Sequence, residues 1–168
     1  MPHPVVLALF DDATVAAGAA RRLRVFGIAR ERVSIVARTH DEEGVIAKTA
    51  EASPGSEIED SGPASRLGEL SAHVLAAIAL VMPGIGPIVA DGPLAAGLGE
   101  AAGHLAGGIG DTLEKAGLSS AAAREWESRV AEGAILVGAH VQESQVSGAA
   151  AVMTQAGGRD VQVGAWPD

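Results

Sequence analysis

The two ends of the chain share one order of elements, and this repeat constrains the fold more than any other feature of the sequence. Near the start, the apolar run from Val5 to Phe10 predicts a buried strand, a helical pattern follows, and Val33 to Val36 alternates as a second strand. Near the end, Ala134 to Val141, Val146 to Gln155 and Val161 to Val163 predict strand, helix and strand again. Two such βαβ units predict an α+β fold with a ferredoxin-like sheet of four strands, the first and third strands being central.

The middle of the chain has to cover the sheet face that the helices of the two units leave bare. We divide the single domain 1–168 into a first βαβ half (1–39), an acidic loop or linker (40–62), a Gly/Ala-rich helical insertion (63–117) and a second half of order αβαβ (118–168). Within the insertion, we expect a helix from Pro63 to Met82, a break from Pro83 to Pro87, and one or two Gly-rich helices from Leu94 to Ala116. We expect the insertion to pack on the sheet or to bind another subunit.

Short polar residues mark the expected starts of two helices. Asp11 or Asp12 follows the first strand, and Ser119 or Ser120 precedes the helix that carries Trp126. Each of these side chains can accept a hydrogen bond from the free amides of a first helical turn. Capping is therefore the role that we assign to them.

Composition argues against several classes of function. The 12 basic and 21 acidic residues give 12 − 21 = −9, which does not suit a phosphate-binding surface, and aromatic residues make up 2% of the chain. The absence of Cys excludes disulfides and thiol catalysis. Phosphate loops, zinc motifs of the His-Glu-x-x-His type and nucleophile elbows are also absent. We predict a protein that is not an enzyme, has no cofactor and does not bind nucleic acid.

One uncharged stretch, from Ala72 to Ala90, is as long as a membrane-spanning helix. Pro83 and Pro87 interrupt it, and no Lys or Arg stands between Leu67 and Glu114 to anchor it at a membrane surface. We therefore predict a buried protein helix, and a cytoplasmic protein, since the first residues do not resemble a signal peptide. Peripheral or inserted membrane binding through the Gly-rich helical hairpin is the alternative.

Three glycines, Gly99, Gly103 and Gly107, fall four residues apart on one predicted helix. Because Gly in a helix interior costs about 1 kcal/mol relative to Ala, close approach of a second backbone is a physical reason for this spacing. Chance in a Gly-rich chain is the other reading, and the packing partner can be the preceding helix, another subunit or lipid. The candidate helix-packing or interface residues are Gly84, Gly86, Gly92, Gly99, Gly103, Gly107 and Trp126.

A further alternative function is the binding of a small apolar ligand or a metal in the same segment, for which the sequence signal is weak. Glu100 and His104 stand four apart on a predicted helix, with His73 and Asp91 in the same apolar region. A structural metal needs about four ligands, so the alternative is a histidine that only forms a hydrogen bond. His140 is interpreted as a side chain at the end of the third strand.

Three stretches together resemble the heat-induced general stress protein family, the YflT-like domain. They are Val5 to Phe10 with Asp11-Asp12, Pro83-Gly84-Ile85-Gly86-Pro87 with Gly92-Pro93-Leu94-Ala95-Ala96, and Gly117-Leu118 with Glu132-Gly133-Ala134-Ile135-Leu136-Val137. The resemblance covers most of the chain and is weakest from His40 to Gly62. It implies a small bacterial stress-associated protein with no catalytic residue or cofactor to assign. The function we expect is non-enzymatic: self-association to a homo-oligomer, or docking to a protein partner, through the Gly/Ala-rich helices.

Overall fold

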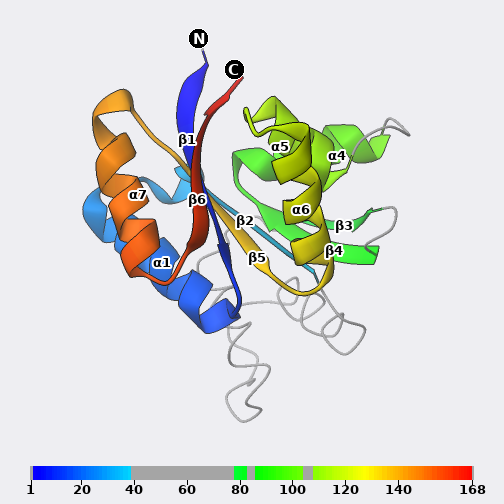
Figure 1. Ribbon diagram of the computed structural model, residues 1–168, viewed down its shortest axis with the longest axis horizontal. Coiled ribbons are helices and arrows are strands. Elements are labelled where there is room, and N and C mark those ends of the chain that lie inside the picture. Colours follow the sequence, from blue (N-terminus) through cyan, green and yellow to red (C-terminus); the bar gives the residue numbers. More distant parts are fainter. Residues whose placement is uncertain (1, 39–77, 83–85, 104–107, 168) are drawn as a thin grey trace.

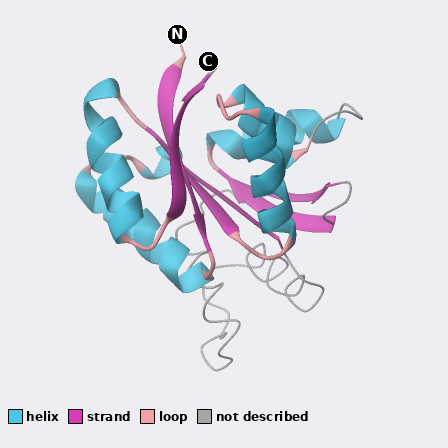
Figure 2. Cartoon of the chain, viewed as in Figure 1, coloured by secondary structure: helices cyan, strands magenta, loops and turns pink. Residues whose placement is uncertain are grey.

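The computed structural model describes residues 2–38, 78–82, 86–103 and 108–167. Figure 1 shows a sheet with a layer of helices on either side, and Figure 2 shows the same layers by type of element. The elements in chain order are β1 (His3–Phe10), α1 (Ala13–Phe26), η1 (Arg30–Arg32), β2 (Val33–Arg38), β3 (Ile78–Met82), β4 (Gly86–Asp91), α4 (Pro93–Gly103), α5 (Ile109–Lys115), α6 (Ser120–Ala131), β5 (Ile135–His140), η2 (Glu143–Gln145), α7 (Val146–Gln155) and β6 (Arg159–Trp166).

The sheet has six strands in the order β3-β4-β2-β5-β1-β6, and every neighbouring pair is antiparallel. The first strand of each predicted βαβ unit, β1 or β5, lies inside the sheet. Each of them is also flanked by strands of the other unit, because β5 lies between β1 and β2, and β1 lies between β5 and β6. The predicted α+β class is confirmed. The sheet is wider than the predicted four strands because β3 and β4 extend it beyond β2.

The helix predicted from Pro63 to Met82 is wrong over its last residues. Ile78–Met82 form the strand β3, which pairs with β4 in the register Ile78↔Ala90 to Met82↔Gly86. Residues 63–77 lie outside the described part of the chain. A continuous apolar run has no polar face to distinguish helix from strand, and pairing with the next apolar run decides between them. Gly86 and Pro87, assigned to a break, are the first residues of β4.

One face of the sheet is covered by α1 and α7 (Figure 1). Val6, Ala8 and Phe10 of β1 project into this layer, where they pack with the buried side of α1. That side is made of Ala16, Ala17, Ala19, Ala20 and Leu23. Because four of these five residues are alanines, the helix backbone can lie close to the strands.

The opposite face is covered by α4, α5 and α6 (Figure 1). Val5, Leu7 and Leu9 of β1 point to this side and pack with apolar residues of the three helices. Trp126 of α6 is 2% exposed and is one of the largest side chains of this core. The chain therefore supplies its own cover for both faces of the sheet.

Local capping signals agree with the structure at both predicted positions. Asp12 accepts a hydrogen bond from the amide of Thr14 at 2.6 Å, and Ser119 accepts one from the amide of Ala122 at 3.2 Å. The first helix ends at Gly27, whose φ of 115° is left-handed. Among the residues described, none of the helices has the length and apolar character needed to cross a membrane.

Candidate functional site

Two buried polar side chains meet at one end of the sheet. Ser34, the second residue of β2, is 0% exposed, and His140, the last residue of β5, is 1% exposed. Ser34 pairs with Gly138 across the ladder, so His140, two residues farther on, lies on the same face. The other buried polar residue in the described part of the chain is Thr112, whose hydroxyl bonds to the carbonyl of Gly108 at 3.2 Å.

Hydrogen bonds join four elements at this point. The Ser34 Oγ lies 3.0 Å from the His140 Nε2, and the His140 Nδ1 lies 3.1 Å from the His3 Nε2. The backbone N–H of Leu94, in the first turn of α4, donates to the Ser34 Oγ at 3.0 Å. We call His3, His140 and Ser34 the Ser–His–His cluster.

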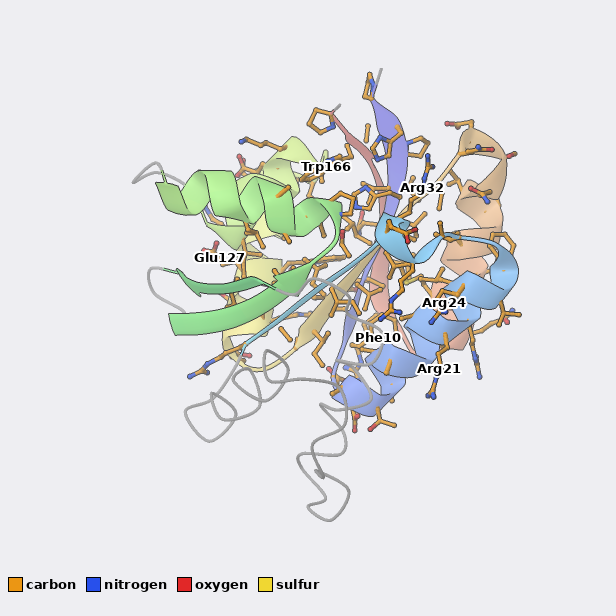
Figure 3. The ribbon with its side chains drawn as sticks, turned by 180° about the vertical axis from the view of Figure 1, so that it is seen from behind. Phe10, Arg21, Arg24, Arg32, Glu127 and Trp166 are labelled. Carbon is orange, nitrogen blue, oxygen red and sulfur yellow. The ribbon has the colours of Figure 1, made fainter. Side chains whose placement is uncertain are left out.

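Trp166 of β6 closes the cluster on its outer side. Its ring meets the His140 imidazole edge to face, with centroids 5.6 Å apart and an interplanar angle of 85°. A Cβ placed on Gly97 of α4 would lie 3.0 Å from the Trp166 Cη2, so the ring also reaches this helix. Figure 3 shows Trp166 at the same end of the molecule as Arg32.

The surroundings of His140 favour its neutral form. The pKa of His140 is lowered from 6.5 to about 3, chiefly by burial and then by its neighbours His3 and Arg32. A neutral imidazole has one donor and one acceptor nitrogen. His140 therefore donates to one of its two neighbours, Ser34 or His3, and accepts from the other.

The order serine, histidine, histidine matches the order of nucleophile, base and orienting group in hydrolases. Two observations oppose that use. The Ser34 Oγ is buried beneath α4 and already accepts the Leu94 N–H, which leaves it no open side for a substrate. In addition, a histidine with a pKa of about 3 is a weak base, whereas a general base works best with a pKa near the operating pH. The arrangement is suited to holding α4 rather than to acyl transfer.

Ser34 does for α4 what an N-cap side chain does for an ordinary helix. The residue before this helix is Gly92, which has no side chain to offer and a φ of 80°. A Cβ on Gly92 would lie 2.5 Å from the Val33 carbonyl oxygen and 2.7 Å from the Ser34 Cα. The close passage of the chain over β2 therefore excludes a capping side chain, and Ser34 accepts the first-turn amide in its place.

The start of α5 is also capped by a side chain from another element. Gly108 precedes this helix without a side-chain cap, and the backbone N–H of Gly110 donates to the Glu127 Oε2 of α6 at 2.6 Å. Figure 3 labels Glu127 on the side of the molecule that carries α4, α5 and α6. The two helices described in the Gly-rich segment, α4 and α5, are thus capped by side chains from other elements.

The four predicted ligand residues are not brought together within the described residues. Asp91 is the last residue of β4 and Glu100 lies on α4, while His73 and His104 fall outside the described residues. Over the ranges that the structure covers, no group of three or more His, Asp or Glu side chains is placed to hold a metal ion. The proposed ligand set stays a prediction.

The predicted packing residues are distributed over several elements. Gly86 begins β4, Gly92 lies against β2, and Gly99 and Gly103 belong to α4; Gly84 and Gly107 fall outside the described residues. Trp126 is buried in the core beneath α6. It therefore acts as a core anchor of this chain.

No motif in the sequence marks His3, Ser34 or Trp166 as site residues, and His140 is predicted only as a side chain at the end of a strand. These residues come from four strands, and Ser34 and His140 are 106 positions apart. A polar residue inside a short apolar strand, such as Ser34 between Val33 and Ile35, was the available signal.

No family model, no curated protein and no solved structure matches this chain.

Proposed function

We propose that the protein is a non-enzymatic domain that acts by associating with a second copy of itself through the β3 edge of its sheet. The resemblance to the general stress family supports a stress-associated bacterial role. The burial of Ser34 and the low pKa of His140 support the non-enzymatic assignment. We further propose that β6-β1-β5-β2 is a ferredoxin-like core, which β3 and β4 extend. A cytoplasmic location stays a prediction.

The observation that carries the proposal is the composition of β3. Its sequence is Ile-Ala-Leu-Val-Met, and it stands at the end of the strand order with a single neighbour, β4, among the described strands. An edge strand offers a row of backbone donors and acceptors, which proteins normally shield with charges, prolines or bulges. Residues 78–82 carry neither a charge nor a proline. Pairing with another strand would satisfy this edge.

The opposite edge of the sheet is protected. Asp160 of β6 forms an ion pair with Arg129 at 2.8 Å, and Arg159 forms one with Asp11 at 3.0 Å. The amide of Ala165 donates to the carbonyl oxygen of Ala116 at 2.9 Å, which occupies part of this edge. The two edges of the described sheet are β3 and β6. Because β6 is protected, we expect β3 of one copy to pair with β3 of another. The expected assembly is a closed twofold dimer rather than a filament.

The helices expected to form the interface, α4 and α5, pack against the sheet of their own chain. Leu94 and Leu98 of α4 and Ile109 and Leu113 of α5 are buried against the sheet, so their apolar sides are already used. This is why we assign association to the strand edge beside them.

The mass in solution tests the proposal. Size-exclusion chromatography with light scattering should give twice the chain mass of 16.8 kDa. Pro87 has no N–H and stands opposite Val81, which suits a pair of residues without hydrogen bonds between them. The amide of Val81 is then directed away from β4. Ala79 lies two residues before Val81, so its amide is assigned to the same, free side of β3. Ala79→Pro should therefore give a monomer while its pairing with β4 is kept.

Val163→Lys is the matched control, because it alters an exposed position on the other edge strand, β6. This variant should remain a dimer. Circular dichroism checks that both variants are folded. A wild-type protein that stays monomeric at high concentration would overturn the proposal whatever the variants do.

A further inference from the structure

Basic residues are concentrated in one short stretch of an acidic chain. Residues 21–32 contain five of the 12 basic residues and one acidic residue, a net charge of 5 − 1 = +4. The rest of the chain then carries −9 − 4 = −13. Such an asymmetry creates a field that orients the molecule toward an anionic surface.

The outer side of α1 places apolar residues among these arginines. Arg21 and Val25 stand four apart, as do Arg22 and Phe26, so each pair shares one side of the helix. Val25 is 90% exposed, and Phe26 is 41% exposed with the end of its ring beside Gly148 of α7, whereas Leu23 is buried in the core. The helix therefore ends in an exposed apolar tip flanked by positive charge.

Arg32 extends this surface beyond the end of the helix. It lies in η1, is exposed, and immediately precedes β2. Figure 3 shows Arg21, Arg24 and Arg32 on the same side of the molecule, on α1 and on the segment that follows it. We call Arg21, Arg22, Val25, Phe26 and Arg32 the basic–apolar patch.

We propose that the basic–apolar patch docks the protein onto an anionic lipid surface. Arginines bind the headgroup phosphates, and the exposed Val25 enters the boundary between headgroups and acyl chains. A nucleic acid would use the arginines but would give Val25 no apolar environment. The rest of the chain has a net charge of −13, which an anionic leaflet repels, so the basic stretch favours approach by this surface.

The expected binding is weak and reversible. Each basic residue close to an anionic leaflet raises the partition coefficient by about fivefold, so three arginines give an enhancement on the order of 10². The patch lies on α1 and η1, and α1 covers the side of the sheet opposite to α4, α5 and α6 (Figure 1). The inference does not depend on the proposed dimer, although two patches in one particle would bind more tightly than one.

Vesicle sedimentation of the full chain tests the inference. The wild type should sediment at least about tenfold more with vesicles of phosphatidylcholine and phosphatidylserine than with phosphatidylcholine alone, and added salt should reduce the difference. The double variant Arg21→Glu, Arg22→Glu should lose about tenfold or more. Val25→Ser, which changes no charge, should lose about threefold.

The control is the double variant Lys115→Glu, Arg124→Glu, which changes the net charge equally at exposed positions of α5 and α6. It should bind within about twofold of the wild type. Equal binding to both kinds of vesicle, or equal losses in the two double variants, would overturn the inference. So would an unchanged Val25→Ser variant, or retention on immobilised polyglutamate without any vesicle binding, since the partner would then be an acidic polypeptide.

Discussion

Glu127 of α6 accepts the backbone N–H of Gly110 at 2.6 Å and so caps the helix that precedes its own. A Cβ on Gly110 would lie 3.1 Å from the same carboxylate oxygen, so the small residue also makes room for the contact. Ser34 caps α4 in the same way from β2. A glycine therefore precedes both α4 and α5, and in each case a side chain from another element accepts an amide of the first helical turn.

Removing the Glu127 carboxylate should destabilise the protein. Glu127→Ala leaves a first-turn amide of α5 without its charged acceptor, and we expect a loss of about 1 kcal/mol in the free energy of unfolding. Denaturant unfolding measures it. Glu125→Ala on the same helix is the control, because its exposed pair with Arg129 at 2.8 Å should contribute about 0.3–0.5 kcal/mol. Equal losses in the two variants would argue against the capping role.

Ser34→Ala should have a larger effect. It removes the acceptor of the Leu94 amide and the hydroxyl that bonds the His140 Nε2, both in a buried setting. We expect a loss of about 2 kcal/mol and faster hydrogen exchange at the start of α4. Ser128→Ala, at an exposed position of α6, should change the stability by less than about 0.5 kcal/mol. A Ser34→Ala variant as stable as this control would show that the cluster does not hold α4.

The parts of the fold that the sequence predicts are those in which neighbouring residues carry the signal. The run from Val5 to Phe10 has the length and composition of a buried strand, and Asp12 and Ser119 cap helices within three residues of themselves. Strands β3 and β4 were missed because their apolar run has no periodicity. Their identity depends on pairing, Ile88 with Leu80 on one side and with Arg38 on the other.

The candidate site was missed for a related reason. Ser34 meets Leu94 across 60 positions and His3 meets His140 across 137. These contacts follow from the order of strands in the sheet and from the register of each ladder, neither of which a single side chain encodes. The low pKa of His140 likewise depends on the layers that bury it.

Stability should fall as the solution is acidified below about pH 6.5. The folded protein holds His140 with a pKa of about 3, below the 6.5 of an unfolded chain, so the unfolded state takes up the proton first. The contribution of His140 is complete above pH 6.5 and is lost progressively from there toward pH 3. The loss in the free energy of unfolding between pH 7 and pH 5 is about 2 kcal/mol.

Denaturant unfolding at several pH values measures this dependence. His140→Gln keeps a donor and an acceptor at the position but cannot titrate, so its stability should vary less over the same range. The difference between the two proteins in the slope of unfolding free energy against pH gives the effect of His140. The carboxyl groups are common to both proteins, and most of them titrate at lower pH. Parallel profiles for the wild type and His140→Gln would contradict the assignment.

Two glycines should respond to alanine in opposite directions. Gly92 has a φ of 80°, and an added Cβ would lie 2.5 Å from the Val33 carbonyl oxygen, so Gly92→Ala combines backbone strain with a clash against β2. We expect it to cost at least about 2 kcal/mol. Gly18 lies inside α1, where an added Cβ would meet nothing within 4 Å, so Gly18→Ala should stabilise the protein by about 0.5–1 kcal/mol through helix propensity. Thermal unfolding of the two variants beside the wild type measures both effects. If Gly92→Ala unfolds at the wild-type temperature, the chain does not pass over Ser34 at this distance, and the reason for a cap supplied by β2 is lost.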